Sequence, residues 1–139
     1  MRFRIAAVMA LLGGGLIAGC GGDGGTPTAA ATPGARLYVA NCIACHQPNG
    51  EGVAGLQPPL AGTPVTVGDA ADLLGWVMFG QRPAALPKGL YGGVMPQFSY
   101  LSDADLAALL THVRSSFGNR APSVTPTMVA EARAAHRGG

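Results

Sequence analysis

The sequence predicts an all-α fold in a single domain, and three observations support that prediction. Apolar residues recur at helical spacing in several segments, which begin at capping residues and end at glycine. No segment alternates apolar and polar residues as a half-buried strand does. The intervening stretches are rich in Gly and Pro, which favour loops. About a hundred residues remain once the N-terminal region is set aside, so one hydrophobic core is expected.

The N-terminus has the pattern of an export signal. Two arginines precede an apolar run over residues 5–18, which is too short to span a bilayer comfortably. The end of this run, LIAGC at 16–20, resembles the lipobox of bacterial lipoproteins, in which the cysteine carries diacylglycerol and becomes the first mature residue. Residues 1–19 are therefore predicted to be a lipoprotein signal peptide, and Cys20 a lipid anchor. The alternative is an ordinary secreted protein, soluble in the periplasm, with a stray thiol.

Residues 20–33 comprise the lipidated cysteine and a stretch of Gly, Thr, Ala and Pro that is predicted to be a flexible linker. Removal of the signal peptide takes away two of the nine Lys and Arg, so seven remain against seven Asp and Glu. A neutral domain with a single lysine, Lys88, is unsuited to nucleic acid and lacks a lysine-rich docking face. We therefore expect docking to partners to be mostly apolar and only weakly sensitive to salt.

The domain itself is predicted to comprise residues 34–139, with a short C-terminal extension from about residue 120. Thr32-Pro33 provides an N-cap followed by a residue suited to the first helical turn. A first helix is expected from there into the segment around residue 42, with Tyr38 on its apolar side. The glycines and prolines that follow this segment predict a long loop.

Three further helices are predicted. The second helix covers Asp69 to Phe79, with Gly80 as its C-terminal stop. The third begins at Ser102 as N-cap and carries an apolar stripe that ends at Gly118. A short fourth helix is expected from Thr125-Pro126 to about Ala135. The stripe of the third helix consists of Leu106, Leu109, Leu110, Val113 and Phe117.

The segment Cys42-Ile43-Ala44-Cys45-His46 has the spacing of a covalent attachment site for haem c. Each thiol can form a thioether with a haem vinyl group, and His46 on the adjoining turn can act as the proximal axial ligand of the iron. A zinc site is a weaker interpretation, because zinc needs four ligands and no second Cys or His pair has suitable spacing. A thioredoxin-like pair would require a βαβ pattern, which is absent. One covalent haem is therefore predicted as a large part of the core.

A haem that carries electrons needs a sixth ligand that stays bound in both oxidation states. The methionine thioether meets this need and raises the reduction potential. Met78 lies in a predicted amphipathic helix and is expected to pack, and Met128 follows the recognisable domain. Met95 lies in a Gly-rich loop, where Pro96 favours an extended conformation for it. Met95 is therefore the predicted second axial ligand.

The other two histidines have less specific surroundings. His112 lies beside the apolar stripe of the third helix and is expected to pack there or lie at the helix edge. His136 is close to the C-terminus and is expected to be solvated. Neither is predicted to bind the iron, and no catalytic nucleophile or acid–base pair is predicted.

Several of these motifs together resemble the class I monohaem cytochromes c. They are Cys42–His46, PPLAG at 58–62, and GGVMPQFSYLSDADLAALLTHVRSSFGN with the RAP that follows it. The likeness is strongest to the haem domains of cytochrome subunits serving membrane-bound bacterial dehydrogenases, such as the quinoprotein alcohol dehydrogenases. It covers about Gly34 to Val129. The resemblance implies the small class I cytochrome c fold, wrapped around one covalently bound haem.

The resemblance also implies contacts outside the attachment motif. In that family the proline at the position of Pro58 presents its carbonyl to the proximal histidine, which would set the tautomer of His46. Gly34 and Tyr38 would form the crossing of the first and last helices. The family usually has an aromatic residue, often tyrosine, at the position of His112. A protonated imidazole there would make the fold or the potential sensitive to mild acid.

These features predict a lipid-anchored electron-transfer protein, not an enzyme, on the periplasmic side of a bacterial membrane. It would carry single electrons between a dehydrogenase or quinol-oxidising complex and a terminal acceptor, with no nucleic-acid partner and no small-molecule substrate. Two alternatives remain open. One is a haem-based enzyme or gas sensor with a labile sixth ligand, and the other is a fixed cytochrome subunit of one dehydrogenase or oxidase complex.

Overall fold

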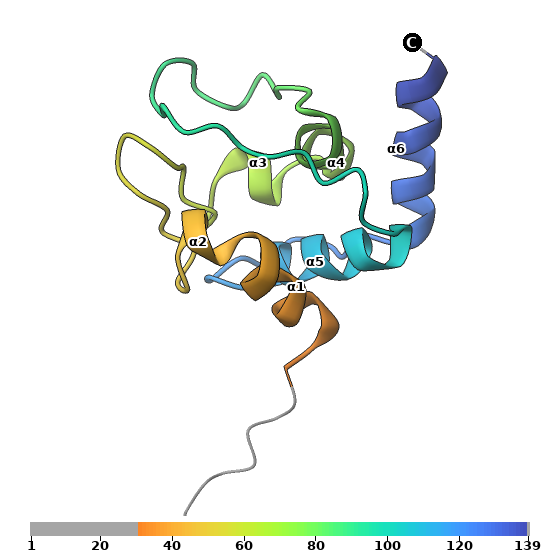
Figure 1. Ribbon diagram of the computed structural model, residues 1–139, viewed down its shortest axis with the longest axis horizontal. Coiled ribbons are helices and arrows are strands. Elements are labelled where there is room, and N and C mark those ends of the chain that lie inside the picture. Colours follow the sequence, from red (N-terminus) through yellow and green to blue (C-terminus); the bar gives the residue numbers. More distant parts are fainter. Residues whose placement is uncertain (1–30, 139) are drawn as a thin grey trace, which may run out of the picture.

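Six helices form the part of the chain that the computed structural model describes, residues 31–138 (Figure 1). They are α1 (Pro33–Asn41), α2 (Ile43–His46), α3 (Pro64–Val67), α4 (Ala70–Phe79), α5 (Asp103–Ser115) and α6 (Pro126–Gly138). Over these residues the all-α prediction is confirmed. The predicted signal peptide, the predicted lipid anchor Cys20 and the linker up to residue 30 lie outside the described residues.

The first helix begins as predicted. The Thr32 hydroxyl accepts a hydrogen bond from a backbone amide of the first turn (3.2 Å), and Pro33 is the first helical residue. The helix is interrupted at Cys42, where φ is −120°. Backbone bonding nevertheless continues, because Cys42 donates to the Tyr38 carbonyl (2.8 Å) and accepts from the His46 amide (2.8 Å). A helical path from Pro33 into the haem motif is thus confirmed, with a break between α1 and α2.

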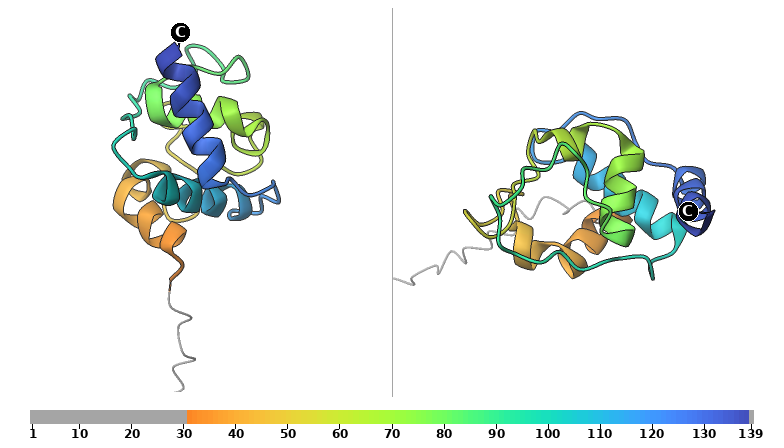
Figure 2. Two further views of the ribbon diagram at one scale, coloured as in Figure 1. Left: turned by 90° about the vertical axis from the view of Figure 1, so that its right-hand side faces the viewer. Right: turned by 90° about the horizontal axis from the view of Figure 1, so that it is seen from above.

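Helices α1 and α5 cross at close range (Figures 1 and 2). A Cβ atom on Gly34 would collide with the carbonyl oxygen of Ala108, so this approach requires glycine. One turn later, Tyr38 is 3% exposed, and its hydroxyl donates to the Gln47 carbonyl at 2.6 Å. The predicted place of Gly34 and Tyr38 at a helix crossing is confirmed. Their partner is α5, the helix that carries His112, as expected from the resemblance.

The second predicted helix is α4, and a shorter helix precedes it. Asp69 caps α4 by accepting a backbone hydrogen bond of 2.6 Å, and Gly80 ends it in the left-handed conformation with φ of 70°. Helix α3 has no counterpart in the prediction. It starts at Thr63-Pro64, the same pair of residue types that starts α1 at Thr32-Pro33, and this repeated pair was the available signal.

Helix α5 ends earlier than its apolar stripe predicted. Ser102 caps the helix through a backbone amide of the first turn (3.1 Å), and the last helical residue is Ser115. Phe117 and Gly118 have positive φ angles of 58° and 81°, which no α-helix contains. The Phe117 ring packs instead against Tyr38, with ring centroids 5.2 Å apart. The prediction that the helical stripe reaches Phe117 is therefore wrong in its last turn.

The C-terminal helix is longer and more firmly packed than predicted. It reaches Gly138, and Val129 is 0% exposed in the core that α6 shares with α4 and α5 (Figure 2). His136 is exposed, as expected, but it also makes contacts that the sequence did not predict. Its ring stacks on Phe79, with centroids 3.8 Å apart, and its Nδ1 lies 3.1 Å from the Gln81 amide nitrogen. The C-terminal region is thus part of the domain and not a tail.

Two buried polar side chains connect the irregular segments to this core. Arg114 is 3% exposed and donates to the carbonyls of Thr66 and Pro122, each at 2.9 Å. Asn119 is 5% exposed and donates to the Leu60 carbonyl at 3.1 Å. A buried polar group left without a partner costs about 1–3 kcal/mol, so these bonds fix the position of the loops they reach.

Candidate functional site

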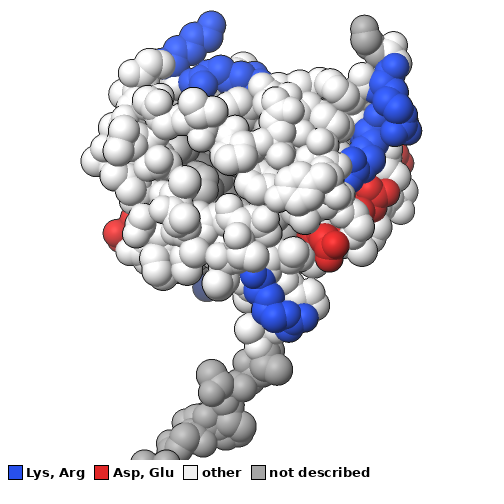
Figure 3. Space-filling view, in the orientation of Figure 1, with Lys and Arg blue, Asp and Glu red and all other residues white. Residues whose placement is uncertain are grey.

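The residues of the predicted haem site line one cavity of about 320 Å³. Cys42, Cys45, His46, Pro58 and Met95 all contribute to its wall, although they come from three segments distant in the sequence. In the space-filling view the surface is hollowed near the centre of a face that carries few charged side chains (Figure 3). The structure therefore brings the predicted haem-binding residues together.

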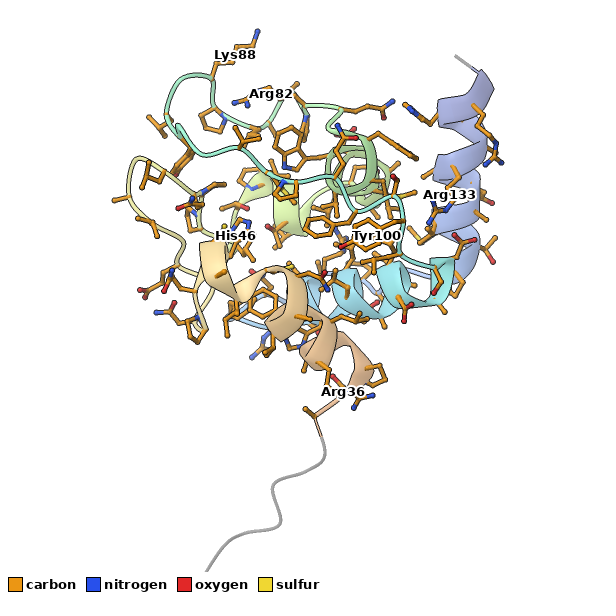
Figure 4. The ribbon with its side chains drawn as sticks, in the orientation of Figure 1. Arg36, His46, Arg82, Lys88, Tyr100 and Arg133 are labelled. Carbon is orange, nitrogen blue, oxygen red and sulfur yellow. The ribbon has the colours of Figure 1, made fainter. Side chains whose placement is uncertain are left out.

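His46 lies at the C-terminal end of α2 and is 8% exposed (Figure 4). Its Nδ1 is 3.0 Å from the Pro58 carbonyl oxygen, so Nδ1 carries the proton and donates it to that oxygen. Nε2 is then the nitrogen with a free lone pair, which is the form that binds a metal. Burial lowers the pKa of His46, and the hydrogen bond to Pro58 opposes that shift. The imidazole is therefore neutral at pH 7.

The loop that carries Pro58 is held against α2 by backbone contacts. The Gly52 amide donates to the His46 carbonyl at 3.1 Å. Gly52 has φ of 66°, and a Cβ atom there would lie 2.6 Å from the Pro58 oxygen. Gly55 also has a positive φ, 73°, but nothing lies within 4 Å of the place its Cβ would take. Glycine at position 52 thus leaves room for the backbone of residues 57 and 58, including the carbonyl that bonds to the imidazole.

Cys42 and Cys45 are three residues apart, so the intervening helical turn puts both thiols on the same wall. Both side chains are half-buried and free of disulfide bonds. Burial, with a smaller contribution from Cys45, raises the pKa of Cys42 to about 11, so this thiol is protonated at neutral pH. Within residues 31–138, no group of three or more His, Cys, Asp or Glu is placed to hold a metal ion.

Met95 reaches the cavity from an irregular segment, residues 80–102, that connects α4 to α5. It is half-buried, whereas Met78 is 0% exposed and packs in the main hydrophobic cluster. Met128 packs at the edge of the same cluster. Neither Met78 nor Met128 lines the cavity. Of the three methionines considered, Met95 is thus the one whose thioether shares a cavity with His46.

Backbone hydrogen bonds hold the Met95 segment on both sides of the methionine. Before it, the Gly93 amide donates to the Leu56 carbonyl at 2.8 Å, in the loop that also carries Pro58. After it, the Phe98 amide donates to the Val77 carbonyl at 3.0 Å, near the end of α4. The position of Met95 therefore depends on contacts with two other parts of the chain.

The rest of the cavity wall is largely apolar. Helix α5 contributes Leu109, Leu110 and Val113, three members of the predicted stripe that are each 5% exposed or less. Helix α4 contributes Leu73 and Trp76, which lie three residues apart and so on one face of the helix. A wall of this kind suits a large apolar ring system, because such a ligand buries the side chains that would otherwise face water.

Sequence reasoning missed one side chain with a distinctive place in this wall. Arg82 is the one Lys, Arg, Asp or Glu among the described residues that line the cavity. Its guanidinium donates to the carbonyls of Leu86 (3.4 Å) and Pro87. The available signal was an arginine in a proline-rich loop that has one other charged residue, Lys88. Residues of α3, which was also not predicted, line the cavity as well.

His112 lies at the crossing of α1 and α5, and it is not among the residues that line the cavity. Its ring centroid is 5.6 Å from that of Tyr38, and its Nδ1 is 3.2 Å from the Ser116 hydroxyl. The imidazole is half-buried, and this burial lowers its pKa. The expectation of a packed or edge histidine is confirmed.

The chemistry of the cavity fits a covalently attached haem. Two thiols can supply the thioethers, a neutral imidazole with a free Nε2 can supply a nitrogen ligand, and a methionine can supply a soft sulfur ligand. The Pro58 carbonyl supports the imidazole in the way that metal-binding histidines commonly require. The apolar walls match the body of the macrocycle.

Comparisons with known proteins agree with this chemistry. Residues 31–117 match the cytochrome c family. A cytochrome c-552 from Thermus thermophilus is 37% identical over 91 residues, which cover 62% of this chain and 69% of that protein. The cytochrome c subunit of an alcohol dehydrogenase (quinone) from Gluconobacter oxydans is also 37% identical over 91 residues. The cytochrome subunit of a fructose dehydrogenase from Gluconobacter japonicus is 33% identical over 115 residues.

The two kinds of relative differ in length. The matched residues cover 64% of this chain but only 19% of the Gluconobacter oxydans subunit. For the fructose dehydrogenase subunit they cover 74% of this chain and 22% of the relative. The chain therefore corresponds to less than a quarter of each of these two dehydrogenase subunits. Helix α6 lies beyond the residues that match the family.

Proposed function

This chain belongs to the cytochrome c family, and we propose that it carries single electrons between a dehydrogenase or quinol-oxidising complex and a terminal acceptor at a bacterial membrane. Its fold is the class I cytochrome c fold and its cofactor is one covalent haem c, so its general role is electron transfer. The observation that carries the proposal is the single cavity on which the attachment motif and Met95 meet.

In this proposal each residue of the site has a separate task. Cys42 and Cys45 form the two thioethers, and His46 and Met95 are the axial ligands. When bound, haem supplies a one-electron couple at its iron. The Pro58 carbonyl holds the proton on Nδ1 of His46, which keeps the imidazole oriented and raises its basicity.

The chain stabilises the cofactor through its surroundings. Met95 offers a thioether that binds iron in both oxidation states, so little ligand rearrangement accompanies each electron. Arg82 is available to the haem carboxylates as the charged side chain on the wall. Apolar residues of α4 and α5 exclude water from the remaining surface of the cavity. These roles account for the side chains of the cavity, and none of them requires a catalytic acid or base.

The surface around the cavity supports docking through apolar contacts. Leu56, Leu90 and Val94 are 51%, 58% and 92% exposed, and Leu56 and Val94 also line the cavity. The face in Figure 3 is mostly uncharged, with Lys and Arg near its edges. Exposed apolar side chains at the mouth of a cofactor cavity favour a partner surface of the same kind. We therefore expect association to depend little on ionic strength.

The relatives support a dehydrogenase as one partner. Their names include the cytochrome subunits of an alcohol dehydrogenase (quinone), a gluconate 2-dehydrogenase and a fructose dehydrogenase. This chain resembles a part of each such subunit, so we assign a dehydrogenase as its electron donor. The test is to supply membranes of the source bacterium with dehydrogenase substrates and to follow reduction of the purified holoprotein and its reoxidation by a terminal oxidase.

We expect one electron per haem and rates that change little with salt. Two results would contradict the proposal. Rapid carbon monoxide binding to the ferrous protein at neutral pH would indicate an open sixth position, as in an enzyme or gas sensor. Migration only within a larger complex after mild detergent extraction would indicate a fixed subunit in place of a mobile carrier.

The membrane location is proposed from the lipobox-like segment that ends at Cys20. Within residues 31–138, no helix combines the length and the apolar character needed to cross a membrane. A diacylglycerol group on Cys20 would hold the domain at the periplasmic side and raise its concentration near membrane partners. We expect globomycin to block maturation and Cys20→Ser to leave the haem spectrum unchanged while releasing the protein from the membrane. Insensitivity to globomycin, with no lipid on Cys20 by mass spectrometry, would support a soluble periplasmic protein.

A further inference from the structure

Arg133 in α6 binds the chain segment that leads from Met95 to α5. Its Nη1 donates to the Ser99 carbonyl at 2.7 Å, and its Nη2 donates to the Leu101 carbonyl. Its Nε forms an ion pair with Asp103, the first residue of α5, at 2.7 Å. The three contacts use the planar fork of the guanidinium, which presents several donors in fixed directions. Figure 4 shows Arg133 on the side of α6 that faces this segment.

The helix that carries Arg133 is held firmly in place. Val129, one turn before Arg133, is completely buried between α4 and α5. Near the other end, the ring of His136 stacks on Phe79, the last residue of α4, with an interplanar angle of 7°. The same imidazole contacts the Gln81 side chain at 3.1 Å. Arg133 therefore projects from a helix that is anchored on both sides of it.

The segment that Arg133 binds has few internal contacts of its own. Residues 80–102 contain no helix, and the bond from the Phe98 amide to the Val77 carbonyl is the backbone bond that links the part after Met95 to α4. Ser99 and Leu101 follow directly, so the two Arg133 contacts come immediately after that bond. The turn at 98–101 has other contacts: the Leu101 amide donates to the Phe98 carbonyl at 3.2 Å, and the exposed Tyr100 hydroxyl donates to Asn41 at 3.2 Å. Arg133 adds the bonds that join this turn to α6.

We propose that Arg133 is a positioning residue for Met95. By binding the carbonyls of Ser99 and Leu101, it holds the segment that presents the thioether, and so keeps the sulfur at the haem iron against competing ligands. This inference rests on the proposed role of Met95 as axial ligand. It assigns to α6, which lies beyond the residues matched to the family, a part in maintaining the electron-transfer site.

The test compares the ferric holoproteins of the parent, Arg133→Met and Arg133→Lys. The readout is the weak far-red charge-transfer band that marks sulfur ligation, followed during heating beside the far-ultraviolet circular dichroism of the helices. In Arg133→Met we expect the band to disappear at a lower temperature than the helices melt. We also expect the ferrous variant to bind carbon monoxide severalfold faster than the parent, and its midpoint potential to fall. Arg133→Lys keeps the positive charge but not the fork, so it should restore these properties only in part.

Two control variants separate positioning from general destabilisation. Ala108→Gly weakens α5 at a site away from the Met95 segment, so its band and its helices should be lost together. Arg137→Met removes a positive charge from the same helix, and it should behave as the parent does. If Arg133→Met also loses the band and the helices together, Arg133 has only a structural role and the inference is wrong. If the parent itself lacks the band, Met95 is not the ligand and the proposed donor set fails first.

Discussion

The two sides of the haem cavity are built in different ways. The side that carries His46 consists of consecutive helical turns, in which Cys42 bonds to both α1 and α2 and Pro58 bonds directly to the imidazole. The side that carries Met95 is an irregular segment, which is held by isolated bonds to other parts of the chain. Its exposed residues include Val94, which is 92% exposed. One side is thus defined by local structure, and the other by distant contacts.

This difference suggests a division of roles. A ligand on a short helix with a direct carbonyl partner keeps its orientation whatever the cofactor's oxidation state. A ligand on an irregular segment can be lost by local movement, because such segments open at a lower free energy than the core. Attachment and the first ligand are therefore expected to tolerate perturbation elsewhere, while sulfur ligation should be the sensitive property.

The largest effect is expected at the attachment cysteines. Replacing Cys42 or Cys45 by serine removes one thioether, and a haem held by a single link is expected to mature poorly. The yield of holoprotein should fall sharply, and the α band of residual haem should shift to the red because one vinyl group stays unsaturated. Absorption spectra and haem-stained gels measure both. Normal yield and an unshifted band in both variants would refute covalent attachment at this motif.

The next effect distinguishes Met95, which lines the cavity, from Met78, which is buried in the core. Met95→Ala should abolish the far-red band, lower the midpoint potential and let carbon monoxide bind the ferrous protein, because the iron loses its sulfur ligand. Met78→Ala should leave all three properties unchanged and cost about 2–5 kcal/mol of unfolding free energy, since Met78 is 0% exposed in the core. Spectroscopy, potentiometry and denaturation measure these quantities.

The opposite result for Met78→Ala and Met95→Ala would contradict the assignment of Met95 as the ligand. If Met78→Ala loses the band and Met95→Ala keeps it, the ligand assignment is wrong and the Met95 segment has another role. Loss of the band in both variants would instead indicate that packing of α4 controls the position of Met95 through its bond from Phe98 to Val77.

A smaller effect is expected for glycines of the loop on the His46 side. Gly55→Ala should cost about 1–2 kcal/mol, the usual penalty for a left-handed conformation in a residue with a Cβ. Gly52→Ala carries the same penalty and also places a methyl group against the Pro58 carbonyl, so its loss of unfolding free energy should be larger. Displacement of Pro58 should also shift the NMR signals of the His46 ring. Equal stability losses and unchanged ring signals would mean that Gly52 does not position Pro58.

The smallest effect is expected from His112 behind the His46 side. Burial lowers its pKa below the ordinary value of 6.5, so the unfolded chain takes up a proton more readily than the folded one. Stability from this group is therefore present above pH 6.5 and is lost as the pH falls below 6.5 through the lower pKa of the folded protein. In holoprotein, the melting temperature of the parent should fall slightly more than that of His112→Tyr between pH 8 and pH 5. If the melting temperatures and midpoint potentials of both proteins follow the same pH profile, His112 has no such role.

Much of the fold was predictable because its signals lie within a few residues of one another. The starts of α1, α4 and α5 follow from Thr32, Asp69 and Ser102, whose side chains accept hydrogen bonds from the next turn. The attachment motif is equally local, because thiols and imidazole occupy neighbouring helical turns. Met95 could be selected from the three methionines by its glycines and by Pro96.

The remaining features depend on residues that are far apart in the sequence. The end of α5 was misplaced because Phe117 keeps the helical spacing but turns with positive φ to pack on Tyr38. His136 looked like a residue of a solvated end, and only the packing of α6 brings it onto Phe79.

The distance in sequence between contacting residues also explains why the His46 side of the haem site was easier to predict than the Met95 side. Caps, turns and covalent spacing depend on hydrogen bonds and distances within one or two helical turns, so the order of residues specifies them directly. The contacts of Arg133 with Ser99 and Leu101 join residues more than thirty positions apart. Such contacts form only after several loops have closed around a common core, and no short pattern in the chain records which groups will meet.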